Sequence, residues 1–307
     1  MENLPDLEHF KPLVSIIMNC FNGDKFLAIA VRSVIAQTFS NWELIFWDNH
    51  STDSSKEIIC SFSDTRIKYF YAPDHTVLYQ ARNLAIEKST GELIAFLDVD
   101  DSWTPDKLEV QVSLFSDSSI GFICSNYWIS RETKLSMSKV YLAHKLLPKI
   151  CNTDQLLRSY FVGLLTLVVR KSLFLRVGGF NSKYNLIGDF DFVLRSSLQS
   201  SFYFISSPLA TYRIHQSNLS KHSRSRWASE FAVWVSATSS EPLISSSPCF
   251  AHFNNFLSYN ECVTLIINSK RFKAFSLWLN MPICLFKLRG LAALLLPRFF
   301  YKYLGYF

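Results

Sequence analysis

The residues with the clearest chemical potential are three carboxylates within four positions. Asp98, Asp100 and Asp101 directly follow the apolar run 93–97. Carboxylates this close repel one another, so a fold that keeps them together needs a compensating cation. Oxygen ligands beside a phosphorylated substrate suit Mg²⁺ or Mn²⁺. The cluster therefore predicts a divalent metal site; the alternative is that Asp101 or Ser102 starts the next helix as its cap.

Polar segments also follow two earlier apolar runs, at residues 19–22 and 48–51. In open α/β sheets, ligands bind beyond the carboxyl ends of the parallel strands. Three polar strand ends on one edge therefore predict a binding site, in which Asp48 contacts a base or ribose. The alternative for Asp48 is a turn-forming role.

Further candidates lie downstream. Asp189, at the start of a helical pattern, is the better candidate for a general base, because an acceptor hydroxyl needs a carboxylate to take its proton. Its neighbour Asp191 is explained by a favourable charge at a helix N-terminus. Arg82 either faces the cleft or is a surface cation. After the last predicted strand, His215 is a candidate metal or phosphate ligand, whereas Arg213 contacts the ligand or lies on the surface.

The elements that must position these groups alternate between short apolar runs and helical patterns. This order, with uninterrupted apolar strands, predicts a Rossmann-like, mostly parallel sheet with helices on both faces. The expected strands are 13–18, 43–47, 67–71, 93–97, 120–125, 164–169 and 202–205. The expected helices are 25–37, 54–62, 78–88, 105–115 (with Thr104 as N-cap) and 189–199.

The chain is predicted to have three parts. Residues 1–222 form the α/β domain, 223–248 a basic and Ser-rich linker, and 249–307 a helical C-terminal region, expected as helices over 250–267 and 272–303. Residues 221–307 contain ten Lys and Arg but three Asp and Glu, a balance of +7, whereas the first 220 residues sum to −1. A near-neutral body with a basic tail predicts an anionic partner for the tail.

The tail mixes Phe, Leu, Trp and Tyr with Lys287, Arg289, Arg298 and Lys302. Apolar faces with basic residues, too broken to span a bilayer, suit an interfacial helix on an anionic membrane surface. Packing on the α/β domain or a homodimer contact is the equal alternative. Nucleic acid is not expected, because the cations form no dense patch. The first residues lack a signal-peptide pattern, so we expect a cytoplasmic protein, with attachment at the cytoplasmic face of the membrane as an extension.

From about residue 12 to 220, the chain resembles the family 2 glycosyltransferases, which are inverting enzymes of the A-type glycosyltransferase (GT-A) fold. The most specific match is Phe96-Leu97-Asp98-Val99-Asp100-Asp101 followed by Trp103, which is similar to the family's Asp-x-Asp metal motif. The other matching segments are 14–22 (first strand and nucleotide loop), 48–53 (base-contacting segment), 81–83 (helix closing over the nucleotide), 178–180 with 188–191 (acceptor side with the base) and 212–220 (segment ordering over the diphosphate).

The resemblance implies a role for each matched residue. Those implied to bind the nucleotide sugar are Phe21, Asn22, Asp48, Arg82, Asn83, Asp98 and Arg213. Asp100 and His215 would hold Mn²⁺ or Mg²⁺ on the diphosphate, and Asp189 would deprotonate the acceptor hydroxyl. The implied reaction moves a sugar from a nucleoside-diphosphate sugar, most simply a UDP-sugar, to a glycan or lipid-linked acceptor with inversion, as in cell-surface polysaccharide or lipopolysaccharide synthesis.

Three positions depart from the family pattern. Asn49 stands where a second Asp is common, His50 where Gly is common, and Gly188 where Glu is usual. These departures leave open a non-catalytic nucleotide- or glycan-binding module on the same fold. A nucleotidyltransferase is a third interpretation, but residues 19–25 do not supply the Gly-rich, Arg-bearing loop that such enzymes carry.

Overall fold

The computed structural model describes residues 11–131, 139–142, 147–218, 224–267 and 269–295. The chain divides into two compact units, each considered by itself. The sheet unit comprises Met1–Thr153 and Phe161–Gln216, and the helical unit comprises Asp154–Tyr160 and Ser217–Phe307.

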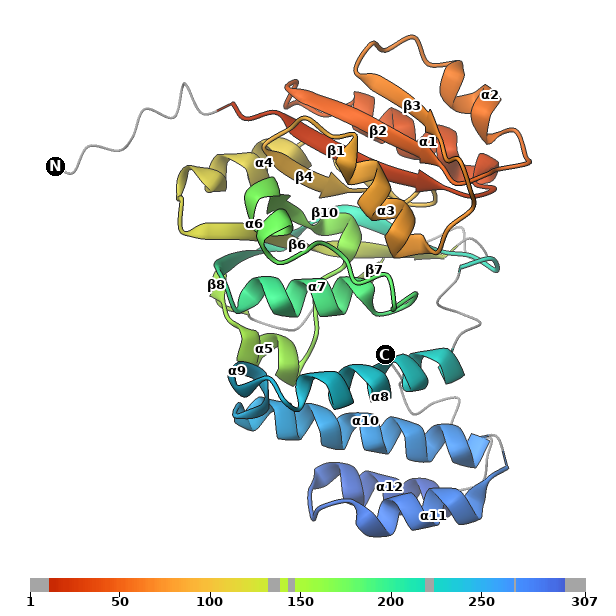
Figure 1. The fold of residues 1–307 in the computed structure, drawn as a ribbon, viewed down its shortest axis with the longest axis vertical. Helices are drawn as coiled ribbons and strands as arrows, with labels where there is room; N and C mark the ends of the chain where they lie inside the picture. The colour runs from red at the N-terminus through yellow and green to blue at the C-terminus, as the bar shows by residue number, and fades with distance from the viewer. Residues whose placement is uncertain (1–10, 132–138, 143–146, 219–223, 268, 296–307) are drawn as a thin grey trace, which may run out of the picture. The chain divides into compact units, whose positions relative to one another are not determined.

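The sheet unit is built on one mixed sheet with the strand order β3-β2-β1-β4-β9-β6-β10-β5 (Figure 1). Most neighbouring strands are parallel; β9 is antiparallel to β4 and β6, and β5 is antiparallel to β10. The strands on this path are β1 (Val14–Cys20), β2 (Trp42–Asp48), β3 (Ile67–Tyr71), β4 (Leu93–Phe96), β5 (Ser102–Trp103), β6 (Ile120–Arg131), β9 (Val168–Arg170) and β10 (Ser201–Ile214). Two short strands pair outside it, β7 (Lys139–Val140) with β6 and β8 (Ile150–Cys151) with β10.

Helices cover both faces of the sheet, as expected. On one face, α1 (Asp24–Ile35) and α4 (Lys107–Ser113) bury Leu27, Val31 and Leu108 in a core with alternate residues of β1, β2 and β4. On the other face, Phe96 of β4 meets Phe180 with ring centroids 5.4 Å apart. That ring packs in turn on aromatic side chains of α3 (Leu78–Glu87), α6 (Lys171–Arg176) and α7 (Gly188–Ser197). The other described helices here are α2 (Ser55–Cys60) and the 3-10 turns η1 (Leu114–Ser116) and η2 (Leu164–Thr166).

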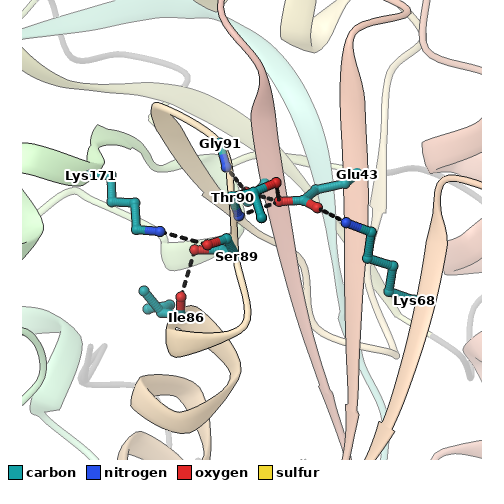
Figure 2. Close-up of polar contacts among 8 residues, drawn as sticks. Glu43, Lys68, Ile86, Ser89, Thr90, Gly91 and Lys171 are labelled. Carbon is teal, nitrogen blue, oxygen red and sulfur yellow. Dashed lines mark hydrogen bonds and ion pairs between the residues drawn. The ribbon is translucent and has the colours of Figure 1, made fainter.

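A buried carboxylate links the strands at the edge of the sheet where they begin (Figure 2). Glu43 of β2 accepts hydrogen bonds from the Ser15 hydroxyl of β1 (2.5 Å) and from the Thr90 amide before β4 (2.6 Å). It also pairs with Lys68 of β3 at 2.6 Å. The Ser15 hydroxyl in turn accepts the Gly91 amide at 2.8 Å. One side chain thus links four neighbouring chain segments.

The structure differs from the predicted elements in a few places. The run 164–169 is divided into the turn η2 and the short strand β9, which is antiparallel to its neighbours. The prediction that Thr104 caps a helix from Pro105 is wrong: α4 begins at Lys107, and Thr104 instead donates its amide and hydroxyl to the Leu209 carbonyl. Strand β10 is much longer than the predicted 202–205.

The helical unit contains α8 (Arg224–Thr238), α9 (Pro242–Ser245), α10 (Pro248–Ile267), α11 (Arg271–Asn280) and α12 (Leu285–Leu295), together with most of α5 (Thr153–Arg158). The segment 223–248, predicted as a linker, is largely helical because it includes α8 and α9. Helices α11 and α12 pack on α10 and on each other (Figure 1). The predicted helix over 272–303 is two helices within its described part, and 296–303 lies outside the described residues. Among the described helices, none combines the length and apolarity needed to cross a bilayer.

Candidate functional site

The predicted polar segments lie at one edge of the sheet. Strands β1, β2 and β4 are parallel and in register, so their ends at Cys20, Asp48 and Phe96 face the same way. The segments 19–22, 48–51 and 98–101 follow these ends directly. The expectation that three strand ends gather their polar residues is therefore confirmed for the backbone.

Asp98 is joined to Arg82 of α3. The Arg82 guanidinium, 4% exposed, lies 2.5 Å from Asp98 Oδ1, whereas the Asp98 side chain is 40% exposed. Removing a guanidinium from water costs free energy, and the ion pair with Asp98 offsets part of that cost for Arg82. The surface-cation alternative for Arg82 is wrong, because the side chain is buried, and its contact with a nucleotide stays a prediction.

Asp100 is joined to the end of strand β10. Its Oδ2 lies 2.8 Å from His215 Nε2, and its backbone carbonyl accepts a 3.0 Å hydrogen bond from Arg213 Nε. The rings of Phe26 and His215 are 5.0 Å apart, and the Arg213 guanidinium lies 4.9 Å from the Phe26 ring. Burial and then the neighbouring charge of Asp98 raise the pKa of Asp100, and the His215 hydrogen bond opposes that rise.

Asp101 has a different environment from the other two carboxylates. It is buried, and its Oδ1 accepts the Arg213 amide at 2.9 Å. Burial and the charges of Asp100 and Asp98 raise its pKa well above the usual range. Because α4 begins at Lys107, the alternative that Asp101 or Ser102 caps that helix is wrong. Asp101 instead connects the acidic loop, residues 98–101, to β10 through the Arg213 amide.

Asp48 uses its carboxylate within the protein. It is 1% exposed; Oδ1 accepts the Ser51 amide at 2.7 Å and Oδ2 accepts the Tyr69 hydroxyl at 3.0 Å. This is the turn-forming arrangement, and contact with a nucleotide base stays a prediction. His50 follows with φ of 70°, a left-handed conformation that glycine adopts without strain. Gly at this position in the family pattern is thereby explained by the backbone.

The two predicted residues of the first loop have different exposures. Phe21 is exposed, with its ring 4.4 Å from that of His75. Asn22 has φ of 54°, and its side-chain oxygen accepts the Thr52 amide at 2.8 Å. Asn22 therefore holds the first and second strand-end loops together, while Phe21 leaves a ring face available to solvent.

The predicted base is held by a tyrosine. Asp189 Oδ1 accepts a 2.9 Å hydrogen bond from the hydroxyl of Tyr79, which is buried on α3. The guanidinium of Arg82 lies 5.0 Å from the centroid of the Tyr79 ring. A continuous series of contacts therefore connects Asp98, Arg82, Tyr79 and Asp189. Burial raises the pKa of Asp189, and the Tyr79 hydrogen bond and the Arg82 charge oppose that rise.

The glycine before the base is required by this tyrosine. A Cβ atom at Gly188 would lie 2.4 Å from the Tyr79 ring, which is closer than carbon atoms can approach. A glutamate at position 188 is therefore incompatible with the present position of Tyr79. The departure from the family pattern at Gly188 has a steric cause.

Two further residues have structural contacts. Asn83 donates its amide to the Phe180 carbonyl at 2.8 Å and accepts the Phe180 amide at 3.1 Å, so both ends of its side chain hold the backbone. Its predicted contact with the nucleotide has no support in this geometry. Asp191 pairs with Arg195 at 2.6 Å. Because Asp191 is paired with Arg195, Asp189 remains the candidate base of this segment.

Asp100 and His215 suit a divalent ion by their chemistry. Carboxylate oxygens suit both Mn²⁺ and Mg²⁺, an imidazole nitrogen suits the transition ion Mn²⁺ better than Mg²⁺, and the like charges of Asp98 and Asp100 favour a nearby cation. Within the described residues, no group of three metal-ligating side chains converges. The protein therefore offers a two-ligand pair, to which a diphosphate would add its own oxygens.

Tyr79 is the site residue that sequence reasoning missed. A tyrosine within a helical pattern is usually interpreted as a core residue. Tyr79 is also 110 residues from Asp189, so no local sequence pattern indicates their contact. The available signal was Gly188, since a missing side chain beside a candidate base implies that another group fills the space.

Comparison with known proteins agrees with this geometry. Residues 15–174 match the family model described as glycosyl transferase family 2, more than half of the chain. The chain belongs to glycosyl transferase family 2. It is 34% identical over 161 residues to the Escherichia coli UDP-Glc:alpha-D-GlcNAc-diphosphoundecaprenol beta-1,3-glucosyltransferase WfgD, covering 52% of this chain and 61% of that protein. The chain spans less than two thirds of the length of the curated relatives that it matches first.

Two solved structures share the fold. TarS 1–349 of S. aureus in complex with UDP-GlcNAc superposes with a TM-score of 0.64 at 15% identity, over 92% of this chain and 79% of that one. The mannosyltransferase PcManGT from Pyrobaculum calidifontis, in complex with GDP-Man and Mn²⁺, gives 0.63 at 16%, over 98% and 85%. The predicted A-type fold with a helical C-terminal region is confirmed.

Proposed function

We propose that this family 2 glycosyltransferase is metal-dependent and inverting. Its donor would be a nucleoside-diphosphate sugar, with UDP as the preferred nucleotide, and its acceptor a hydroxyl of a glycan or lipid-linked glycan. The observation that carries the proposal is the series Asp98–Arg82–Tyr79–Asp189, which joins the acidic residues 98–101 to a half-buried carboxylate. A hexosyl transfer needs these two functions side by side.

In the proposed reaction, the acceptor hydroxyl attacks the anomeric carbon from the side opposite the diphosphate. Asp189 takes the proton of that hydroxyl as the new glycosidic bond forms, and the bond to the diphosphate breaks. Arg82 holds Asp98 toward the donor, and the Arg213 backbone and side chain hold the acidic loop. A single displacement inverts the anomeric configuration.

Asp100 and His215 would hold Mn²⁺ or Mg²⁺. A bound divalent ion neutralises charge that develops on a departing diphosphate. What supports this assignment is the 2.8 Å approach of His215 Nε2 to Asp100 Oδ2 beside a second carboxylate. The Mn²⁺ in the PcManGT complex is in line with it.

The named substrates of the relatives support a proposed substrate class. The E. coli relative is named for UDP-glucose and a lipid-diphosphate-linked acceptor, and TarS was solved with UDP-GlcNAc. We therefore assign this chain to cell-surface polysaccharide or lipopolysaccharide synthesis, with a UDP-hexose donor. A lipid-linked acceptor would bring the enzyme to the cytoplasmic face of a membrane.

The decisive experiment uses Asp189→Asn. We expect transfer to fall about 10²–10⁴-fold, since that is the usual contribution of a general base, while UDP binding measured by calorimetry is retained. Asp106→Asn, on an exposed residue at the start of α4, is the matched control and should leave both unchanged. Full transfer by Asp189→Asn would refute the assigned base. A wild-type chain that binds UDP-sugars but transfers to no acceptor would favour the non-catalytic module.

A further inference from the structure

The helical unit carries an apolar surface on the outside of helices α11 and α12. We call it the outer face. Its members are Phe272, Phe275 and Leu279 of α11, Ile283 of the connection, and Leu285, Leu288 and Leu295 of α12, and all are exposed. Phe272 is 86% exposed and Ile283 is 95% exposed. Large apolar groups that cluster in this way mark a surface that binds a partner.

The helix period shows why these side chains share one surface. Phe272, Phe275 and Leu279 are spaced three and seven residues apart, which places them on one stripe of α11. The buried residues Ala274 and Met281 lie on the opposite stripe and pack against α10. Helix α12 repeats the arrangement, with Phe286, Gly290 and Ala293 buried and Leu285, Leu288 and Leu295 outside. Both helices are therefore apolar on two opposite sides.

Specific contacts hold the two helices in place. Trp278 Nε1 donates to the Lys287 carbonyl at 2.8 Å, and Lys287 Nζ donates to the carbonyls of Leu279 (3.0 Å) and Met281 (2.7 Å). A Cβ at Gly290 would lie 3.0 Å from the Trp278 ring, so the glycine permits this close approach. The outer face is thus a built surface whose geometry does not depend on a partner.

All charged side chains of α11, α12 and the residues between them are Lys or Arg. Residues 262–307 contain seven Lys and Arg and no Asp or Glu. Lys270 directly before α11, Lys273 on α11 and Arg289 on α12 are all exposed. Each cation near an anionic bilayer adds favourable attraction, whereas apolar side chains gain by entering the acyl boundary.

We propose that the outer face docks on an anionic lipid bilayer, with the apolar stripes of α11 and α12 in the interface and the cations at the headgroups. A second copy of the chain fits less well. A twofold contact through this face would bring the same cations together without a carboxylate to pair them. The surface chemistry alone carries this inference, which holds whether or not the proposed transfer reaction is correct.

The test is sedimentation of the full chain with vesicles, without substrates. We expect binding to phosphatidylcholine vesicles that contain phosphatidylglycerol, and much weaker binding to phosphatidylcholine alone. The triple variant Phe275→Glu, Leu279→Glu, Ile283→Glu should lose binding. The control triple Leu175→Glu, Val233→Glu, Leu243→Glu changes exposed apolar residues outside the outer face and should bind like the wild type.

A second variant addresses the charges. Lys270→Glu, Lys273→Glu, Arg289→Glu should weaken partitioning into anionic vesicles by on the order of a hundredfold or more. Circular dichroism and thermal unfolding confirm that each variant is folded, since all the altered side chains are exposed. Absence of wild-type binding, or equal binding by the two apolar triples, overturns the proposal. A wild-type dimer that the Phe275 triple dissociates, with no vesicle binding, would show that the occupant is a second copy.

Discussion

Tyr79 fills the space that a side chain at position 188 would occupy, and its hydroxyl contacts the carboxylate next to that position. A Cβ atom at position 188 would lie 2.4 Å from the Tyr79 ring, and the hydroxyl of the same tyrosine lies 2.9 Å from Asp189. The carboxylate common at position 188 in the family is absent here, and the neutral phenol of Tyr79 lies beside the proposed base, Asp189. The hydrogen bond stabilises the ionised form of Asp189, which is the form that accepts a proton.

Tyr79→Phe should therefore change the pH dependence of transfer. Removing the hydroxyl removes an interaction that lowers the pKa of Asp189, so that pKa rises further. The acidic limb of the kcat/KM profile should move to higher pH, and activity at acidic pH should fall more than at alkaline pH. Tyr203→Phe, on β10, is the control. An unchanged acidic limb in Tyr79→Phe would contradict the role given to the phenol.

Gly188→Ala tests the steric half of the same arrangement. The added methyl group meets the Tyr79 ring, so we expect a loss of about 1–3 kcal/mol in the free energy of unfolding. The double variant Gly188→Ala, Tyr79→Leu relieves the contact and should recover part of that stability while transfer stays low. Chemical denaturation of the single and double variants measures both effects. Additive losses would show that the two positions do not interact.

The carboxylates of this site were predictable from the sequence pattern, and the resemblance implied that His215 acts with Asp100, but neither predicted the pairing of Asp98 with Arg82 or of Asp189 with Tyr79. Asp98, Asp100 and Asp189 stand out because polar residues directly follow apolar runs or open a helix. The contacts of Arg82, Tyr79 and His215 join residues that lie 16 to 115 positions from their partners. Spacing carries no information about such distant pairs.

Strand β10 organises the site at the scale of elements. It pairs with β6 along most of its length and with β5 near its end, and Arg213 and His215 follow from that end. The pairing register of β10 with β6 shifts around Pro208, which has no backbone N–H to donate to the neighbouring strand, and the strand then continues. This break explains why an apolar run at 202–205 predicted less than half of the strand.

The helices of the segment 223–248 were missed for a related reason. Segments rich in Ser and Pro are usually interpreted as loops. Pro242 and Pro248, however, each occupy the first position of a helix, where a missing amide costs no hydrogen bond. The bounds of strands β1 to β4 were predicted to within two residues, because short, mainly apolar runs bounded by polar turns have few other interpretations.

Glu43 gives the sheet a pH-dependent element of stability. Burial alone would raise its pKa, but the bonds from Lys68, Ser15 and Thr90 outweigh burial and lower it to about 2. In the unfolded chain it titrates near its ordinary value of 4.5. Its stabilising contribution is therefore complete above about pH 4.5 and is lost as the pH falls toward 2.

Glu43→Gln should lower the free energy of unfolding by about 1–3 kcal/mol at neutral pH. The difference from the wild type should shrink as the pH falls from about 4.5 toward 2, because the wild-type carboxylate is then protonated as well. Urea unfolding across that range gives the comparison, with the exposed Glu87→Gln as control. A constant difference at all pH values would contradict the ionised network.

At the scale of the whole chain, the two units differ in charge and in surface. The sheet unit has three carboxylates clustered at residues 98–101, whereas the helical unit ends in a stretch without any. The first property suits a metal-bound diphosphate and the second suits an anionic surface. Mutations in one unit should therefore leave the other function measurable.

Nucleotide binding should raise the stability of the chain in a metal-dependent way. At UDP concentrations a hundredfold above the dissociation constant, the free energy of unfolding rises by about 2.7 kcal/mol. We expect this shift to require Mn²⁺ or Mg²⁺ and to be lost in His215→Ala, but not in the exposed His252→Ala. Thermal-shift measurements with UDP and GDP, with and without metal, test it. A metal-independent shift that persists in His215→Ala would remove that residue from the site.

The pairing of β5 with β10 also orders events during synthesis. Ser102 and Trp103, next to the acidic cluster, pair with Thr211 and Ala210, which leave the ribosome about a hundred residues later. A nascent chain that ends before residue 200 contains all three carboxylates of the cluster but not the amide of Arg213 that binds Asp101. We expect the growing polypeptide to gain affinity for its donor late, after β10 has joined the sheet, so an incomplete enzyme does not sequester activated sugar.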